Sequence, residues 1–135
     1  YMIYEAHLLG ASAVLLICAI LDDGQLREYK KIADRLGLDA LFEAHDENEI
    51  SRAVNAGAQI IGVNNRNLKD FTVDINNSVR LRGLVPKDIL FVSESGMKTQ
   101  DDIRHLKENG TDAVLIGEAF MRSSNKKEML ERMKG

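Results

Sequence analysis

The sequence has little of what marks secreted, membrane or nucleic-acid-binding proteins. It contains one cysteine, one proline and no tryptophan in 135 residues, so no disulfide can form within the chain. It shows no signal-peptide pattern and no apolar run of membrane-spanning length, so we expect a cytoplasmic protein without a membrane partner. A formal net charge of −3 provides no basic field for a polyanion, which excludes nucleic acid as an expected partner.

The proportions of hydrophobic and charged residues are typical of one globular domain, and we assign residues 1–135 to a single domain. It is 44% hydrophobic and 29% charged. Cys18 lies in an apolar run, which predicts a core residue and not a nucleophile. The three histidines, His7, His45 and His105, share no ligand spacing, so no metal site is expected. His45 is predicted to be a rim residue.

Apolar runs alternate with amphipathic segments along the chain, and this alternation predicts strands and helices in turn. The first run carries no charge, which predicts a strand covered on both faces. The predicted strands are 13–21, 38–44, 59–63, 89–93 and 113–116. The predicted helices are 1–9, 25–36, a segment between the Asp46 cap and Gly57, about 76–82, 100–109, and a C-terminal segment that breaks near 123–125.

Helix-capping residues stand where these helices should begin. Asp22 and Asp23 offer a cap to the second helix, and Thr99 offers one to the fifth. Asp46 followed by Glu49 three residues later predicts a capping box.

Strand starts recur roughly every 25 residues, the length of one βα unit. The pattern therefore predicts the α/β class with a parallel sheet of five βα units. The residues alone leave two arrangements open. One is a doubly wound sheet of flavodoxin type, which the chain length favours, and the other is part of an eight-unit barrel.

Polar side chains follow several predicted strands, at the edge where parallel sheets build their sites. Glu43 sits between apolar neighbours, where a carboxylate tends to keep its proton as a general acid or base does. An ion pair with Arg66 across the sheet is the structural alternative. Asn64 and Arg66 should share one side while Asn65 points the other way. Arg66 suits a carboxylate or phosphate, whereas bracing is the favoured role for Asn65 and Asn67.

The last two strand ends carry acids, a hydroxyl and glycines. Glu94 and Ser95 could act as acid and hydrogen-bond donor, and Gly96 lets backbone N–H groups approach a ligand. A simple tight turn is the alternative. Gly117 and Glu118 stand at a predicted helix start, where free N–H groups attract an anion.

Six stretches together closely resemble the indole-3-glycerol phosphate synthases of tryptophan biosynthesis, and the resemblance covers nearly the whole chain. Ser-Glu-Ser-Gly recurs in other phosphate-binding barrels, whereas Asn-Asn-Arg-Asn-Leu in this context is specific. The stretches are YEA at 4–6, AVLLI at 13–17, EAHD at 43–46, IGVNNRNL at 61–68, VSESG at 92–96 and LIGEAFM at 115–121.

The resemblance implies a TIM (βα)8 barrel of which this chain supplies the third helix onward, that is, a preceding helix and strands 4 to 8. It also implies a carboxy-lyase that needs no cofactor and acts on a small phosphorylated substrate. In this family 1-(2-carboxyphenylamino)-1-deoxyribulose 5-phosphate undergoes ring closure, decarboxylation and dehydration to give indole-3-glycerol phosphate.

The resemblance also implies roles for individual residues. Glu43 matches the acid/base glutamate of strand 5, and Asn64 matches the strand-6 asparagine that orients the substrate. Glu94 and Ser95 match the catalytic pair of strand 7. The implied substrate- or phosphate-binding positions are Arg66, Gly96, Leu115, Gly117 and Glu118.

The family's catalytic lysine on strand 3, and its lysine and glutamate on strand 1, have no counterpart in these residues. We therefore expect little or no activity from the isolated chain, and self-association through uncovered apolar faces and barrel edges. The rival interpretations are a receiver-type domain with Asp22 and Asp23 as its metal site, and a different phosphate-binding barrel. The first lacks the later lysine and hydroxyl residues, and the Asn-Asn-Arg-Asn run disfavours the second.

Overall fold

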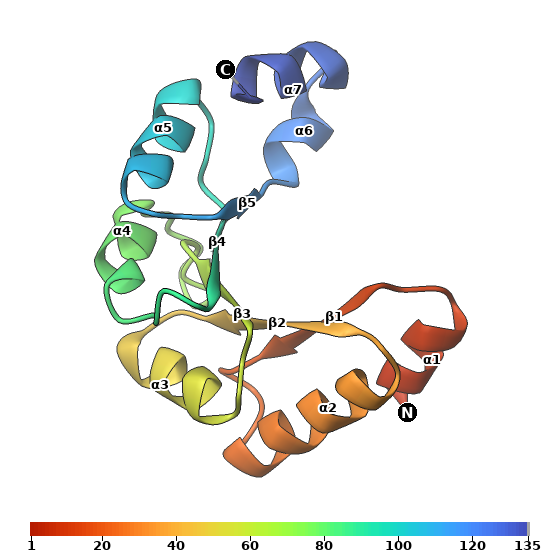
Figure 1. Ribbon diagram of the computed structural model, residues 1–135. Coiled ribbons are helices and arrows are strands. Elements are labelled where there is room, and N and C mark those ends of the chain that lie inside the picture. Colours follow the sequence, from red (N-terminus) through yellow and green to blue (C-terminus); the bar gives the residue numbers. More distant parts are fainter. Residues whose placement is uncertain (135) are drawn as a thin grey trace.

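The computed structural model describes residues 1–134. It contains one curved parallel sheet, with helices packed on its convex side (Figure 1). Its five strands pair in chain order, and every pairing is parallel. The strands are β1 Ala13–Ile17, β2 Asp39–Ala44, β3 Ile60–Asn64, β4 Leu90–Glu94 and β5 Ala113–Leu115. The helices are α1 Met2–Leu8, α2 Asp23–Arg35, α3 Glu47–Asn55, α4 Asn76–Arg82, α5 Gln100–Glu108, α6 Glu118–Arg122 and α7 Lys126–Lys134.

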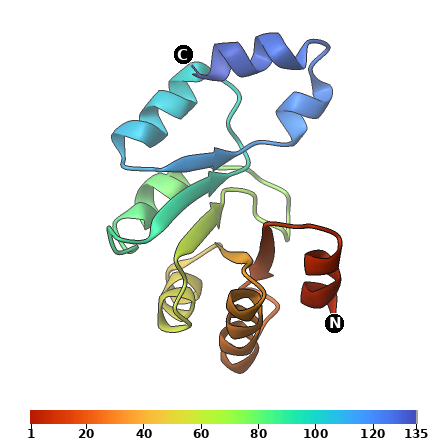
Figure 2. The same cartoon turned by 45° about the vertical axis from the view of Figure 1, so that its right-hand side comes forward.

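The sheet topology decides between the two arrangements that the residues left open. In a doubly wound sheet the strand order reverses and helices cover both faces. Here the order never reverses, and α2 to α5 all lie outside the curve of the sheet (Figure 2). The partial barrel is therefore confirmed, and the flavodoxin-type arrangement is wrong.

Local capping fixes where most helices begin. The Asp22 carboxylate accepts from the Gln25 amide at 2.8 Å, and the Gln25 side chain accepts from the Asp22 amide at 3.0 Å. Thr99 caps α5 with the same reciprocal pattern. Asp46 caps α3 as predicted, but the Glu49 carboxylate accepts from the His45 amide, so the predicted capping box does not form.

The first strand is shorter and less covered than its sequence predicts. β1 ends at Ile17, and Leu15 keeps 48% of its surface exposed, because it is in register with Leu41 on the concave face of the sheet, which no helix within residues 1–134 covers. The chain then turns toward α2, where the Arg52 guanidinium donates to the carbonyl groups of Cys18 and Leu21. Cys18 is fully buried, which confirms a core residue, and burial raises its thiol pKa to about 12.

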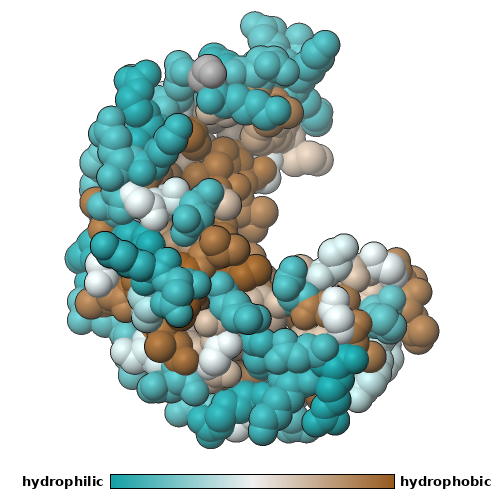
Figure 3. All heavy atoms as spheres, viewed as in Figure 1, coloured by the Kyte–Doolittle hydropathy of each residue, from teal (hydrophilic) through white to brown (hydrophobic). Residues whose placement is uncertain are grey.

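The two faces of the sheet differ in how well they are covered. On the convex face Phe42, Ile61 and Phe91 are fully buried beneath the helices. On the concave face Leu90 and Leu115 remain more than half exposed, and apolar side chains line the hollow of the molecule (Figure 3). Strands that alternate apolar residues on both faces are typical of sheets that are covered on both sides. None of the helices within residues 1–134 is long and apolar enough to cross a bilayer.

We expect the 135-residue chain to self-associate as its concentration rises, because apolar side chains line its concave face and each edge strand leaves backbone groups without a strand partner among residues 1–134. Sedimentation velocity over a concentration series measures this directly. Leu90→Lys should weaken the association, whereas Leu84→Lys, at an exposed leucine outside the strands, should not. A monomer at every concentration would contradict the expectation.

Candidate functional site

Three of the predicted catalytic side chains stand at the carboxyl ends of neighbouring strands. Asn64 on β3 pairs in register with Glu94 on β4, while Glu43 on β2 pairs with Gly62 on β3. Side chains that are in register across a parallel sheet point to the same face. The fold therefore gathers Glu43, Asn64 and Glu94 on the concave side of one rim.

Glu43 and Glu94 form a buried carboxyl pair. They expose 6% and 4% of their surface. Burial raises the pKa of Glu94 to about 7, and the negative charge of Glu43 and a hydrogen bond with it contribute in the same direction. A carboxyl group that is partly protonated near pH 7 can both donate and accept a proton, which suits general acid and base catalysis.

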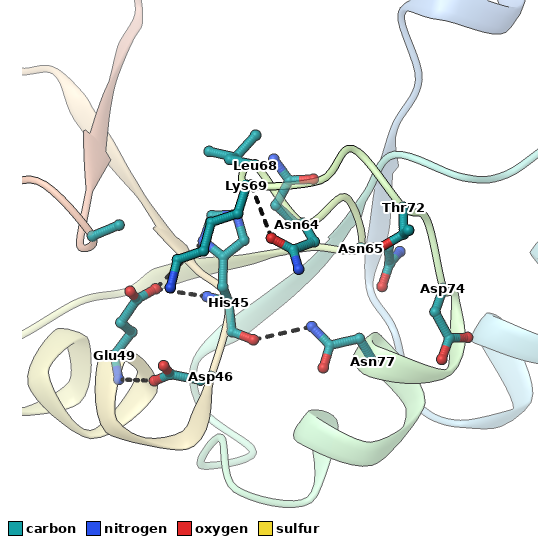
Figure 4. Close-up of a pocket in the computed structure, with 12 residues that line it drawn as sticks. His45, Asp46, Glu49, Asn64, Asn65, Leu68, Lys69, Thr72, Asp74 and Asn77 are labelled. Atoms are coloured by element: carbon teal, nitrogen blue, oxygen red, sulfur yellow. Dashed lines mark hydrogen bonds and ion pairs between the residues drawn. The ribbon is translucent and has the colours of Figure 1, made fainter.

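His45 stands beside this pair and lines a pocket that Asn64 also lines (Figure 4). Its Nε2 atom lies 3.8 Å from Oε1 of Glu43, and its Nδ1 atom lies 3.4 Å from Oε2 of Glu49. The same Glu49 oxygen accepts from the His45 amide at 2.8 Å. These contacts are consistent with the prediction that His45 is a residue of the rim.

Asn65 braces the rim from the opposite face of the sheet. Its side-chain NH₂ donates to Ser93 Oγ at 2.9 Å and to the Ser95 carbonyl at 3.0 Å. Its side-chain oxygen accepts from the amide and hydroxyl of Ser78 at 3.0 and 2.8 Å. All four hydrogen-bonding positions of the amide are thus used. The predicted bracing role of Asn65, and its opposite orientation to Asn64, are confirmed.

The loop after β4 has an unusual backbone, which Asn65 helps to hold. Ser95 has φ of 65° and Gly96 has φ of 92°, both in the left-handed region. A side chain at Gly96 would also meet Cγ1 of Val73 at 2.7 Å. The positive φ and this close approach both favour glycine at position 96.

A groove beside this loop is lined by all five of the predicted binding positions. The side chains of Arg66, Lys98 and Arg122 bring positive charge to it, and the carboxyl groups of Glu94 and Glu118 also line it. Two of its lining residues are joined by a backbone hydrogen bond, in which the Ser95 amide donates to the Leu115 carbonyl at 3.4 Å. The predicted site residues that line the groove are Arg66, Glu94, Ser95, Gly96, Leu115, Gly117 and Glu118.

Arg66 is held in the groove by an ion pair that sequence reasoning did not identify. Its guanidinium contacts Oε2 of Glu118 at 2.6 Å, and Arg122 contacts the other oxygen at 3.0 Å. Hydrogen bonding from Arg122 and the charge of Arg66 hold the pKa of Glu118 below its ordinary value. The structural alternative of a Glu43–Arg66 ion pair is therefore wrong.

The two acids of the rival receiver-type interpretation have structural roles. Asp22 caps α2, and the Asp23 carboxylate pairs with the Arg52 guanidinium at 2.6 Å. Among residues 1–134, no three His, Cys, Asp or Glu side chains are grouped so that they could hold a metal ion.

Sequence reasoning missed two residues of this region. Lys98 lines the groove but follows the recognisable motif by two positions. Gly62 lies directly beneath the Glu94 carboxyl group, where an added Cβ atom would fall 1.9 Å from Oε1. The available signal was a glycine inside a strand, which often marks the close approach of another group.

Comparison with known proteins identifies a family whose members resemble this chain in sequence. The family model described as indole-3-glycerol phosphate synthase matches residues 1–133. The chain is 61% identical to an indole-3-glycerol phosphate synthase of Ruminiclostridium cellulolyticum over 135 residues, and 55% identical to one of Leuconostoc mesenteroides. Each alignment covers 100% of this chain and 52% of the relative, so the chain spans about half the length of the curated relatives it matches.

Solved structures of low sequence identity share the fold. A 3-hexulose-6-phosphate synthase from Salmonella typhimurium superposes with a TM-score of 0.80 at 15% identity, over 96% of this chain and 64% of that one. A thiamine phosphate pyrophosphorylase from Pyrococcus furiosus gives 0.77 at 20% identity, over 98% and 62%. These likenesses support a barrel-type fold only.

We expect the free energy of unfolding to fall as the pH rises from about 5 to about 8, because folded Glu94 has a pKa of about 7 against an ordinary 4.5. In this range the folded chain keeps a proton that the unfolded chain has released, so its stability is present at the low end and lost at the high end. The loss should be on the order of 3 kcal/mol at most. Urea denaturation at several pH values measures it.

Glu94→Gln should remove most of this slope, since the amide has the shape of the protonated acid and does not titrate. Glu108→Gln, at an exposed site on α5, serves as the matched control and should retain the slope. An unchanged pH dependence in Glu94→Gln would contradict the expectation.

Proposed function

The chain belongs to the indole-3-glycerol phosphate synthase family, and we propose that its residues supply the acid/base and phosphate-binding part of that active site. The family consists of decarboxylating lyases of tryptophan biosynthesis. The proposed substrate is 1-(2-carboxyphenylamino)-1-deoxyribulose 5-phosphate, and the proposed product is indole-3-glycerol phosphate.

One observation carries this proposal: a proton-holding carboxyl pair and a cationic groove meet at the same rim, with Glu94 belonging to both. A phosphorylated substrate with an acid/base reaction at its other end requires such a combination. The backbone of Gly96 would bind the phosphate, and the backbone of Gly117 and Glu118 would do so from the facing loop. Arg66, Lys98 and Arg122 supply the complementary charge.

The proposed chemistry divides between the two carboxyl groups. Ring closure joins the aromatic carbon that bears the carboxylate to the ketone carbon of the sugar, and the ketone oxygen takes up a proton. The new ring then loses carbon dioxide, which restores the aromatic ring. The hydroxyl leaves as water after a second protonation, and the CH₂ carbon beside the ring nitrogen releases a proton to complete the indole. Glu94, partly protonated near neutral pH, is suited to donate. Glu43, directly beside it, is suited to accept a proton in return.

Two polar residues of β3 and its following loop would orient the substrate in this proposal. Asn64 shares the face of the carboxyl pair, and its oxygen already accepts from the Arg66 amide at 3.0 Å. The Arg66 guanidinium suits the ring carboxylate that is later lost. Binding of that carboxylate would replace the contact with Glu118. Ser95 offers a hydroxyl at the junction between the carboxyl pair and the phosphate loop.

We expect the chain to bind indole-3-glycerol phosphate more tightly than inorganic phosphate, because the groove contacts both ends of the product. Calorimetry measures both affinities, and amide shifts of Ser95, Gly96 and Gly117 locate the site. Lys98→Ala should weaken binding of the product about tenfold, by loss of a charged contact with its phosphate. Arg104→Ala, at an exposed arginine of α5, should leave it unchanged. Equal affinity for product and bare phosphate would contradict this function.

We expect the 135-residue chain assayed by itself to turn over the substrate far more slowly than its full-length relatives. The lysine that the family places on strand 3 has no counterpart in these residues, and a general acid contributes about 100- to 10,000-fold. Steady-state assays with the anilino-deoxyribulose phosphate measure this. Fusion to the remaining part of the Ruminiclostridium cellulolyticum relative should restore turnover, and Glu43→Gln should abolish it again. Near-normal turnover by the isolated chain would contradict the expectation.

A further inference from the structure

Gly62 occupies the centre of the concave face. It lies inside β3, the middle strand of the sheet, and pairs in register with Glu43 on one side and Val92 on the other. It is buried, although it has no side chain to pack. A glycine weakens the interior of a strand, so its presence there requires a packing reason.

The Glu94 side chain supplies this reason, since it lies across the strand at that point. A Cβ atom added to Gly62 would fall 1.9 Å from Oε1 and 2.9 Å from Cδ of Glu94, and 3.2 Å from a methyl group of Leu41. At the first two distances, either the added atom or the buried Glu94 side chain would have to move. The carboxyl group of Glu94 therefore occupies the space that a residue with a side chain would fill.

This crossing brings Glu94 close to Glu43 on the far side of β3, where both carboxyl groups are buried and a hydrogen bond between them contributes to the raised pKa of Glu94. Two ionised carboxylates have no proton to share, and Oε1 of Glu94 finds no donor among residues 1–134. One proton between them forms the hydrogen bond and removes the repulsion of like charges.

Other charged groups lie around Glu43 and Glu94, but each has its own partner or lies outside the contact between the two carboxyl groups. His45 approaches Glu43 from the end of β2, with Glu49 of α3 behind it. On the other side, the groove next to Glu94 contains the side chains of Arg66, Lys98, Glu118 and Arg122. Arg66 and Arg122 are already paired with Glu118. Among residues 1–134, Glu43 is the one charged neighbour that contributes to the raised pKa of Glu94.

We propose that Gly62 is a positioning residue of this site: its missing side chain lets the Glu94 carboxyl group cross β3 and hold a single proton in common with Glu43. A catalytic role for this carboxyl pair rests on the proposed function, whereas the position of Glu94 over Gly62 does not depend on it. Two chemically identical side chains would thereby divide into one acid and one base, as neighbouring carboxyl groups with separated proton affinities do.

The first experiment compares two glycine substitutions by thermal unfolding at pH 6. Gly62→Ala should lower the midpoint by about 5 °C or more, because the added methyl group overlaps Glu94. Gly83→Ala is the matched control, since its Cβ atom would meet nothing within 4 Å and its backbone is helical. The loss caused by Gly62→Ala should shrink when Glu94 is replaced by the shorter aspartate. An equal loss in both backgrounds would assign the clash to Leu41 or the backbone, and would overturn the proposal.

The second experiment follows Glu94 itself by carbon-13 NMR titration of its side-chain carboxyl group. In the unmodified chain this group should titrate near pH 7. Glu43→Gln, which removes the charge of its partner, should lower that midpoint by about one pH unit. An unchanged midpoint in Glu43→Gln would overturn the shared proton, even if Gly62→Ala failed to fold. No substrate is used, so a failure of the proposed function would instead appear as lost product binding in a chain whose Glu94 titrates as expected.

Discussion

Parallel pairing in chain order is the constraint on which the site depends. Each strand of a parallel sheet must be followed by a crossover, so all carboxyl ends point to one rim and all helices can lie on one side. In this chain, the rim receives Glu43, Asn64 and Glu94 from three consecutive strands. Their proximity is a product of the topology, because no two of these residues are close in sequence.

The convex core and the rim differ in how their residues contribute to stability. The core is stabilised by burial of large apolar side chains such as Phe42 and Phe91. The rim carries features that cost stability, including the buried carboxyl pair and two consecutive left-handed residues at Ser95 and Gly96. Such costs persist where the surroundings over-determine them and function requires them. The buried side-chain amide of Asn65 connects the core to the rim through its hydrogen bonds to Ser78 and Ser95.

The elements themselves could be predicted from the sequence, since strand starts, helix caps and glycine stops are local signals. The partial barrel could not be derived from those signals, because length favoured a doubly wound sheet and only the resemblance indicated otherwise. Contacts between distant residues were also beyond local patterns. Arg66 pairs with Glu118, which lies 52 positions later, and Glu49 turns to the His45 amide and not to the Asp46 cap. The room above Gly62 depends on the path of another strand's side chain.

The hydrogen bonds of Asn65 have a consequence for the thermodynamics of ligand binding. A flexible phosphate loop would lose conformational entropy when a ligand ordered it, and that loss would reduce affinity. Here the Ser95 carbonyl is already fixed by a buried amide, which is itself fixed by Ser78. The loop is therefore preorganised, with the entropic cost of its shape met during folding. Ligand binding at this rim should accordingly be accompanied by little change in backbone order.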